Sequence, residues 1–325
     1  MSKGVMNNMK IICSKSNLLY GVNIVSKAVP TRTTMAILEC ILIDASAGEI
    51  KLTANDMELG IETKIEGEIE ERGIIALDAK VFSDIVRKLP DNEVVIETDS
   101  SFKTTITCEK AKFNIIGKSG EDFSYIPYIE RNEEITISQF TLKEVIRQTI
   151  FSIADNDNNK LMTGELFEIN ENSLKVVSLD GHRISIRNIE LKNNYEHKKV
   201  VVPGKTLQEI SKILSTDAEN MVNVYFTNNH ILFEFDNTTV VSRLIEGEYF
   251  KINQMLSSDY ETKLKINKKE FLDCIDRATL LVREVDKKPI IINITDNDME
   301  LRIDSTMGSM NEEIDIEKEG KDIMI

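Results

Sequence analysis

The stretch KVFSDIVRKL at residues 80–89 recurs as KTLQEISKIL at residues 205–214, an offset of 125 residues. A shorter apolar pattern also recurs, at Leu18/Val22, Leu142/Ile146 and Phe271/Ile275. Solenoid repeats are roughly 20–50 residues long, so a period near 125 residues indicates repetition of a whole domain. We expect tandem copies of one fold, two complete and one partial, arranged as an arc or ring.

Each complete copy is expected to run helix, strands, helix, strands, which makes the chain an α+β protein. In the first copy, Leu18, Val22, Val25 and Val29 share one helical face, and a second helix over 79–89 ends before Pro90. The other expected helices span 141–154, 204–214 and 268–284. Strands are expected at 41–43, 50–53, 61–65, 94–97, 103–108, 112–116, 164–169, 174–178, 183–189, 222–227, 231–235, 239–245, 290–294, 300–303 and 312–316.

The repeats divide the chain into three predicted domains after a short N-terminal extension over residues 1–8. The first domain is expected over 9–131 and the second over 132–258, each joined to the next by a short polar stretch. The third, over 259–325, starts with a matching helix and strands. The sequence then ends where its second helix should begin, so we expect about half of that copy to be present.

Composition is typical of a globular protein, with 41% hydrophobic and 29% charged residues in 325. No apolar run approaches the ~18–20 residues that span a bilayer, and the first residues lack the apolar segment of a secretory signal. The four cysteines (Cys13, Cys40, Cys108 and Cys274) lie far apart and form no CxxC pair. We expect buried free thiols in a cytoplasmic protein.

The net charge of −15 is unevenly distributed. The five helical windows 15–32, 77–91, 140–154, 204–214 and 267–288 hold 16 Lys and Arg against 10 Asp and Glu, a net of +6. The rest of the chain carries −21. An acidic total argues against a nucleic-acid partner, but cations gathered on helices would provide a local surface for phosphate.

Three further stretches carry a family pattern: VSLDGHRI at 177–184, LMTGELFE at 161–168 and VVVPGK at 200–205. PTRTT at 30–34 adds to it. In this order, inside a domain-length repeat, they resemble the bacterial sliding clamp, the beta subunit of the replicative DNA polymerase. The resemblance covers the chain from Met9 to Ile325.

The resemblance implies tandem copies of the DNA clamp fold in a non-catalytic subunit of the DNA-directed DNA polymerase complex, a nucleotidyltransferase. It implies a homodimeric ring, when the chain is full length, that encircles duplex DNA without reading its sequence. The implied partners are the replicative polymerase, the clamp loader and repair proteins carrying short clamp-binding peptides. It implies no cofactor, no metal and no membrane.

The resemblance also implies a peptide-binding pocket on the second domain. Its matched positions are Met162, Leu179, Gly181, His182, Arg183, Ile184, Phe250, Gln254 and Met255. Two positions depart from the family, which often has Thr at the place of Leu179 and Pro at the place of Phe250. The rim is therefore more apolar here. The family also uses residues from its extreme C-terminus, so we expect this groove to be open on one side.

The segment Asp180-Gly181-His182-Arg183 admits three interpretations. Asp, His and Arg together suggest general acid–base catalysis. The chain has only three histidines, however, and His182 has no second carboxylate pattern around it. A purely structural turn between two strands is the second interpretation. The third, favoured by the resemblance, makes the segment the border of the peptide pocket.

The DNA-facing residues implied by the resemblance and the repeat are Arg32, Lys80, Arg87, Asn156, Lys160, Lys205 and Lys212. A solvated helix face is the alternative for the four repeated cations, and Asp155 and Asp157 weaken the assignment of Asn156 and Lys160. For the dimer interface, the matched residues are Phe113 and Ile115 on an edge strand and Leu280 and Leu281 at the end of a helix. Adjacent leucines could equally belong to a core.

Two functions of other classes stay open at the level of sequence. A β-rich adaptor that binds peptides and never encircles DNA would suit the acidic total charge. A hydrolase or transferase that uses His182 would need a convergent polar pocket. Basic residues gathered on one concave wall would favour the processivity clamp over the adaptor.

Overall fold

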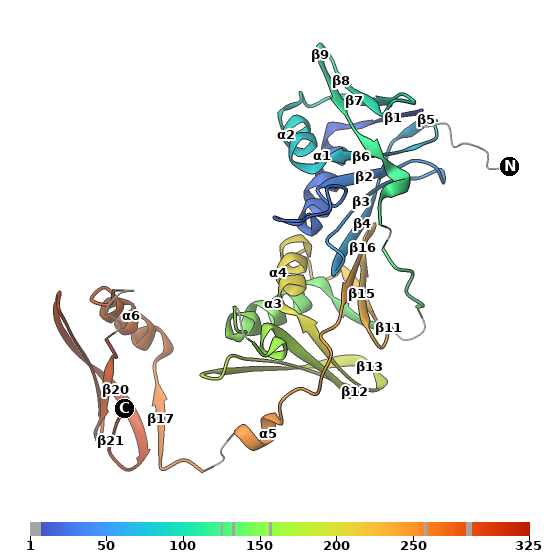
Figure 1. Cartoon of the computed structure of the whole chain (residues 1–325). Coiled ribbons are helices and arrows are strands. Elements are labelled where there is room, and N and C mark those ends of the chain that lie inside the picture. The colour runs from blue at the N-terminus through green and yellow to red at the C-terminus, as the bar shows by residue number, and fades with distance from the viewer. Residues whose placement is uncertain (1–7, 125, 132–133, 156–157, 257–258, 284–287) are drawn as a thin grey trace. The chain divides into compact units, whose positions relative to one another are not determined.

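The computed structural model describes residues 8–124, 126–131, 134–155, 158–256, 259–283 and 288–325 (Figure 1). The predicted N-terminal extension lies outside these ranges except for Asn8. The chain divides into two units, Met1–Tyr249 and Phe250–Ile325, and each is described by itself. None of the described helices has the length and apolar character needed to cross a membrane.

The first repeat of unit 1 packs two helices, α1 (Lys15–Val25) and α2 (Ala79–Lys88), against antiparallel sheets. One sheet has the order β5-β1-β7-β8-β9. Its strands are β1 (Met9–Ser14), β5 (Glu68–Glu71), β7 (Glu93–Thr98), β8 (Lys103–Cys108) and β9 (Ala111–Ile116). The second sheet contains β2 (Cys40–Asp44), β3 (Ile50–Asn55), β4 (Leu59–Ile65), β6 (Ile74–Asp78) and β10 (Lys118–Ser119).

The second repeat follows the same order around helices α3 (Gln139–Thr149) and α4 (Gly204–Ile213). Its strands are β11 (Glu134–Ser138), β12 (Gly164–Leu179), β13 (Ile184–Pro203), β14 (Met221–Phe226), β15 (His230–Phe235) and β16 (Thr238–Arg243). The pair β12–β13 forms a long hairpin, and β12 bends near Glu171, where φ is +51° and the register shifts.

A continuous nine-stranded sheet joins the two repeats, in the order β10-β6-β2-β3-β4-β16-β15-β14-β11. The junction is the antiparallel pair β4–β16, in which Thr63 lies opposite Thr238 and Leu59 opposite Ser242. The buried hydroxyls of Thr63 and Thr238 are 2.9 Å apart and form a hydrogen bond. One apolar core runs through both repeats, with Phe82, Phe167 and Phe233 among its fully buried side chains.

Figure 1 shows α1, α2, α3 and α4 on one side of unit 1, with strands of the shared sheet on the other. The same helices present apolar faces to the core. In α2 the buried residues are Ala79, Phe82, Ile85 and Val86, which recur at helical spacing. The opposite face of each helix is therefore available to solvent or to a partner.

Unit 2 contains α5 (Ile252–Met255), α6 (Lys268–Thr279) and a five-stranded sheet in the order β17-β20-β19-β18-β21. Its strands are β17 (Thr262–Ile266), β18 (Ile291–Ile294), β19 (Asp298–Ser305), β20 (Gly308–Gly320) and β21 (Ile323–Met324). A small core of its own gathers Cys274, Leu301 and Ile314 beneath α6. This unit is the partial third copy of the fold. The bounds 9–131, 132–258 and 259–325 given above for the three domains remain predictions.

The α+β class and the repeated helices agree with the sequence analysis, and several elements differ in their bounds. The helix expected over 268–284 ends at Thr279, and the one expected over 141–154 ends at Thr149. The stretches expected as separate strands over 164–169 and 174–178 both belong to β12, and the strand expected over 183–189 continues to Pro203 as β13. The strands β5, β6, β10, β11, β17 and β21, each of five residues or fewer, were not predicted.

Candidate functional site

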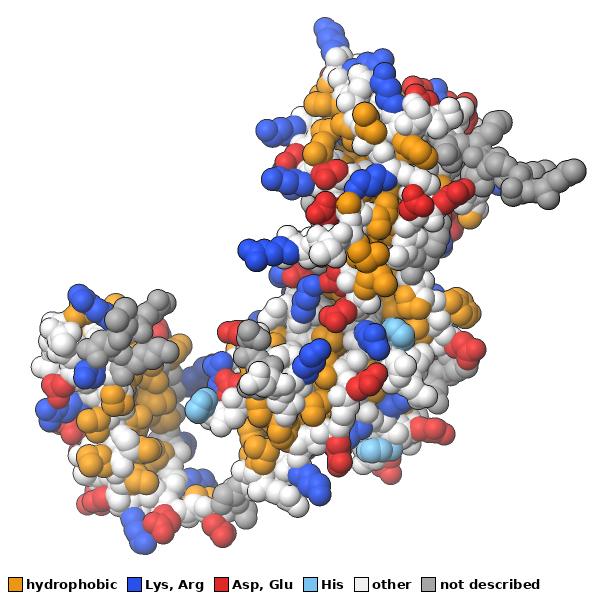
Figure 2. Space-filling model, in the orientation of Figure 1, with side chains coloured by type: hydrophobic (Ala, Val, Ile, Leu, Met, Phe, Trp, Pro, Cys, Tyr) orange, Lys and Arg blue, Asp and Glu red, His pale blue; other side chains and the backbone are white. Residues whose placement is uncertain are grey.

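The repeated cations of α2 and α4 lie on the solvent faces of their helices. The Asp78 side chain caps α2 by accepting a hydrogen bond of 2.8 Å from the Val81 backbone N–H, which fixes where the helix starts. Lys80 and Arg87 are exposed on this helix, as are Lys205 and Lys212 on α4. Figure 2 shows Lys and Arg side chains, with some acidic ones, projecting from the helical side of unit 1.

Three of these four cations form ion pairs. Arg87 lies 3.0 Å from Asp84, and Lys212 lies 2.7 Å from Glu209, each within its own helix. Lys205 instead pairs with Asp56 of the first repeat. Lys80 has no acidic partner within the described ranges. The pairs of Arg87 and Lys212 are exposed to solvent, and exposed pairs contribute about 0–1 kcal/mol, so they hold these two side chains only weakly.

The other predicted DNA-facing residues lie in loops. Arg32 is exposed after the 3₁₀ turn Ser26–Ala28 that follows α1. Lys160 is exposed at the start of the 3₁₀ turn Lys160–Thr163, and its carbonyl accepts a hydrogen bond of 2.7 Å from the Thr163 hydroxyl. Asn156 lies outside the described residues.

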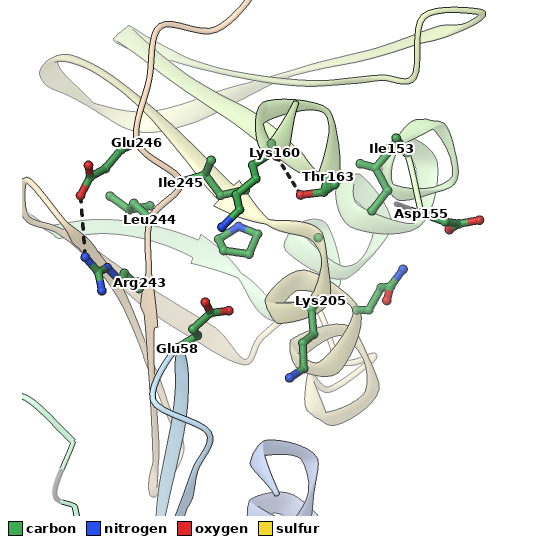
Figure 3. A pocket seen from close by; sticks show the side chains of 14 residues that line it. Glu58, Ile153, Asp155, Lys160, Thr163, Lys205, Arg243, Leu244, Ile245 and Glu246 are labelled. Atoms are coloured by element: carbon green, nitrogen blue, oxygen red, sulfur yellow. Dashed lines mark hydrogen bonds and ion pairs between the residues drawn. The ribbon is translucent and has the colours of Figure 1, made fainter. Parts of the chain in front are cut away.

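A cleft of about 730 Å³ lies where the two repeats of unit 1 meet (Figure 3). Three cations line it, Lys160, Lys205 and Arg243, and so do three acidic residues, Glu58, Asp155 and Glu246. Apolar side chains, including those of Ile153, Leu244 and Ile245, complete the wall. The cleft therefore brings together Lys160 and Lys205, two of the residues predicted to face DNA.

The turn Asp180–Arg183 joins β12 to β13 and is held by its own first side chain. Asp180 Oδ1 accepts hydrogen bonds from the backbone N–H groups of His182 (3.0 Å) and Arg183 (3.1 Å). Asp180 Oδ2 accepts a hydrogen bond of 2.9 Å from Arg183 Nε. These bonds hold the pKa of Asp180 below its usual value. Gly181 has φ of +88°, a conformation that suits glycine.

The segment 151–154 connects this turn to the 3₁₀ turn that carries Met162. The Arg183 guanidinium lies 5.7 Å from the centroid of the exposed Phe151 ring. The hydroxyls of Ser152 and Ser185 are 2.6 Å apart, and the Ala154 N–H donates to the Met162 carbonyl at 2.8 Å. Met162 and residues 181–184 are thus brought to one region of unit 1.

Exposure differs among these predicted pocket residues. Gly181, His182 and Arg183 are exposed, whereas Met162 and Ile184 are half-buried. Leu179 is fully buried and belongs to the structural support of the turn. Phe250, Gln254 and Met255 belong to unit 2. Phe250 is half-buried there, while Gln254 and Met255 are exposed on α5.

A second copy of this turn, which the sequence analysis missed, joins β3 to β4 in the first repeat. Asp56 Oδ1 accepts hydrogen bonds from the N–H groups of Glu58 (3.0 Å) and Leu59 (2.7 Å). Met57 has φ of +75°, as Gly181 has +88°. Asp56 and Asp180 stand 124 residues apart, so the repeat includes this turn. Only the two aspartates could have signalled it, because the other turn residues differ.

Glu165 on β12 is a second residue that the sequence analysis did not single out. Both of its carboxyl oxygens are buried and accept no hydrogen bond within the described structure. Burial raises the pKa of Glu165 from 4.5 to about 8. The nearby Thr149 hydroxyl donates to the Val145 carbonyl at 2.8 Å instead. Burial and the nearby Glu165 carboxyl group together raise the pKa of Tyr249.

The residues predicted for a subunit interface occupy two edges. Strand β9 is the last strand of its sheet, with Phe113 38% exposed and Ile115 partly packed against the core. In unit 2, Leu280 is 75% exposed and Leu281 is half-buried, directly after α6 ends. An edge strand presents unpaired backbone groups that can pair with another chain.

Features of an enzyme site are scarce in the described part of the chain. It contains no group of three or more His, Cys, Asp or Glu side chains placed to hold a metal. All four cysteines are buried and free, as predicted. Burial raises the pKa of the Cys13 thiol to about 12, so that thiol is a poor nucleophile.

Two family models match this chain. The model of the DNA polymerase III beta subunit N-terminal domain matches residues 9–127, and that of the central domain of the same subunit matches residues 136–251. The beta sliding clamp of Staphylococcus aureus is 35% identical over 316 residues, covering 94% of this chain and 84% of its own length.

Solved structures of similar proteins have the same fold. A protein assigned as a DNA polymerase III beta subunit from Eubacterium rectale is 82% identical, with a TM-score of 0.96. The DNA polymerase sliding clamp from Bacillus subtilis is 33% identical, with a TM-score of 0.94. Each comparison covers 98% of this chain and 86% of the other.

Proposed function

This chain belongs to the family of bacterial DNA polymerase III beta subunits, the sliding clamps, and we propose which of its residues hold DNA and partner peptides. As a member of that family it is a processivity factor of the replicative polymerase and has no catalytic activity of its own. His182 is therefore not a catalytic residue, and the hydrolase or transferase alternative is excluded.

The proposed DNA-facing surface is the helical side of unit 1. The observation that supports it is the repetition of exposed cations on equivalent helices, Lys80 and Arg87 on α2 and Lys205 and Lys212 on α4. Arg32 and Lys160 extend the set in adjacent loops. Asn156, outside the described residues, stays a prediction. Lysine and arginine side chains bind phosphate without reading bases, which is the requirement for a protein that slides.

Ion pairing within α2 and α4 does not oppose this role. Asp84 and Glu209 hold Arg87 and Lys212 in weak, solvent-exposed pairs, so a phosphate oxygen can replace the carboxylate at little cost. Contacts that exchange easily are suited to movement along a duplex. They also imply that binding depends strongly on salt, since each neutralised phosphate releases counterions.

The test is the salt dependence of binding to a short fluorescein-labelled DNA duplex, followed by fluorescence anisotropy. The variant combines Lys80→Gln, Arg87→Gln and Lys212→Gln. If each residue contacts one phosphate, the slope of log K against log salt becomes shallower by about 2.7 in total, at about 0.9 per contact. Circular dichroism melting should stay unchanged, because all three side chains are exposed.

A matched control removes three cations from strands instead. It combines Lys10→Gln, Lys51→Gln and Lys64→Gln, each of which also forms an ion pair with glutamate. Its net charge equals that of the helical variant, so a general charge effect would change both slopes equally. Equal slopes for the two triple variants would contradict the proposed surface.

The proposed peptide site lies beside the turn 180–183. Gly181, His182 and Arg183 are exposed there, Met162 and Ile184 are half-buried, and Phe151 adds an exposed aromatic ring. A methionine and an aromatic ring beside fixed polar groups suit short peptides of varied sequence. Leu179 would act through the turn. Phe250, Gln254 and Met255 of unit 2 remain predicted members of the site.

We also propose that Phe113, Ile115, Leu280 and Leu281 contribute to the interface of a homodimer. The proposed partners are duplex DNA, the replicative polymerase, the clamp loader and repair proteins with short clamp-binding peptides. The cytoplasm is the proposed compartment, since reduced thiols are usual there.

A further inference from the structure

The side chains of Asp56 and Lys205 form an ion pair that crosses from the first repeat of unit 1 to the second. Asp56 lies in the turn between β3 and β4, and Lys205 in the first turn of α4. The Asp56 side chain is only 8% exposed, whereas that of Lys205 is 58% exposed. The pair therefore joins a buried carboxylate to an amine that can still reach solvent.

Backbone hydrogen bonds determine where the Asp56 carboxylate lies. One oxygen accepts from the N–H groups of Glu58 and Leu59, so the other oxygen is left for Lys205. The turn itself is held at the junction of the repeats, because the Arg243 N–H donates to the Glu58 carbonyl at 2.8 Å. The carboxylate is thus directed at α4 by the fold and does not depend on a mobile side chain.

Lys205 differs in this respect from the other repeated cations. Its counterpart Lys80 has no acidic partner within the described structure, and Lys212 pairs with Glu209 of its own helix. If Lys205 moved to a DNA phosphate, Asp56 would stay behind as a largely buried charge without its counterion. Leaving a buried charge unpaired is far more costly than breaking an exposed pair.

We infer that Asp56 is an internal competitor of DNA phosphate for Lys205, so that this lysine fastens the two repeats together and contributes little to DNA binding. The inference rests on the proposed DNA-facing role of the helical side. It changes the predicted role of Lys205, which shares its helix position with Lys80 but not its electrostatic surroundings. Lys205 also lines the cleft where the repeats meet.

Asp56→Asn tests this inference, because asparagine keeps an oxygen for the two backbone bonds and loses the charge. In the anisotropy assay with the labelled duplex, we expect Asp56→Asn to steepen the salt slope by about 0.9, one additional phosphate contact. Lys205→Gln should leave the slope unchanged, whereas Lys80→Gln should reduce it by about 0.9. The double variant of Asp56 and Lys205 should behave as Lys205→Gln does.

Asp180→Asn is the matched control, since it makes the same charge change in the equivalent turn of the second repeat. An equal steepening in Asp56→Asn and Asp180→Asn would overturn the inference, as would a gain that persists when Lys205 is glutamine. Should Asp56→Asn fail to fold, the contrast between Lys205→Gln and Lys80→Gln still decides: equal losses of slope refute the competition.

A measurement without DNA separates this inference from the proposed function. A double-mutant cycle of Asp56→Asn and Lys205→Gln in urea unfolding should give a favourable coupling between the two residues. No coupling would refute the fastening role even if the protein binds DNA. Suppose that the cycle shows coupling, but replacement of Lys80, Arg87 and Lys212 leaves the salt slope of DNA binding unchanged. That result would refute the proposed DNA-facing surface and would support the role of the Asp56–Lys205 pair in joining the two repeats.

Discussion

In the first repeat, Asp56 holds its turn with one carboxylate oxygen and contacts Lys205 of the second repeat with the other. In the second repeat, Asp180 holds an equivalent turn with one oxygen and contacts Arg183 of the same turn with the other. The backbone motif is the same, down to a positive φ at the next residue. The two turns differ in the partner of the second carboxylate oxygen.

That difference shows how one repeated element can serve two purposes. In the first copy, the Asp56 carboxylate contacts the neighbouring repeat and helps to hold the two repeats together. The second copy keeps its charge within the turn and leaves His182 and Arg183 exposed, next to Phe151. The turn that contacts the neighbouring repeat in the first copy thus corresponds to the turn that borders the proposed peptide site in the second.

The cores of the two repeats differ at an equivalent position as well. Ile41 lies opposite Leu77 in the β2–β6 pair, and Glu165 lies opposite Val202 in the β12–β13 pair, 124 and 125 residues later. Both side chains are fully buried. The first repeat therefore has an apolar side chain where the second has a carboxyl without a hydrogen-bond donor.

The largest effect is expected when Glu165 is replaced by the residue of the first repeat. The folded-state pKa of Glu165 is about 8, above its ordinary value of 4.5, so the unfolded chain loses this proton first as the pH rises. The free energy of unfolding should fall between about pH 5 and pH 9, by on the order of 4 kcal/mol. Glu165→Ile should abolish that decline, as measured by urea unfolding at both pH values.

Glu168→Gln serves as the control for Glu165→Ile, because Glu168 lies on the same strand but is half-exposed and close to Lys175. Its replacement should leave the decline with pH in place. If the free energy of unfolding of Glu165→Ile still declined with pH, another group would be responsible for the decline. The difference between Ile41 and Glu165 would then not explain the pH dependence of stability.

A smaller effect is expected at the positive-φ positions of the two turns. Gly181→Ala introduces a Cβ that meets no atom within 4 Å, so only the backbone conformation opposes it. We expect a loss of about 1 kcal/mol in unfolding free energy. Met57→Ala, in the equivalent position, should be nearly neutral because Met57 already has this conformation and an exposed side chain. Urea unfolding of both variants at neutral pH compares them, and equal losses would contradict the view that only the backbone conformation opposes Gly181→Ala.

The smallest effect concerns the ion pairs inside α2 and α4. Double-mutant cycles to alanine for Arg87 with Asp84 and for Lys212 with Glu209 should each give about 0.3–0.5 kcal/mol. Both values should shrink as salt is added, because the two cations are exposed. A coupling much larger in one helix than in the other would show that the two helices have diverged in more than the partner of Lys205.

Helix positions were predictable from sequence because the signals are local. Leu18 and Val22 mark the buried face of α1, and Pro90 follows the end of α2. The same rule overextended α6, since Leu280, Leu281 and Val282 continue its apolar pattern after the helix has ended at Thr279. For the candidate sites, sequence identified the exposed cations and the turn 180–183, both of which belong to contiguous segments.

What sequence could not provide depends on contacts between distant segments. The pairing of β4 with β16 joins residues about 175 positions apart, and alternation within a strand does not specify its neighbour. Asp56 is unremarkable in sequence until α4 brings Lys205 to it. Glu165 lies in an alternating strand like many surface glutamates, and only the packing of α3 over β12 makes it buried.

The shared sheet has a further consequence for how the first two repeats behave as a mechanical body. Backbone hydrogen bonds cross the β4–β16 junction just as they do within either repeat, so no hinge of irregular chain separates the two halves there. Bending at this point would require rupture of a whole ladder of bonds. Force applied by a moving polymerase would therefore be transmitted across the β4–β16 junction without bending unit 1 at that point.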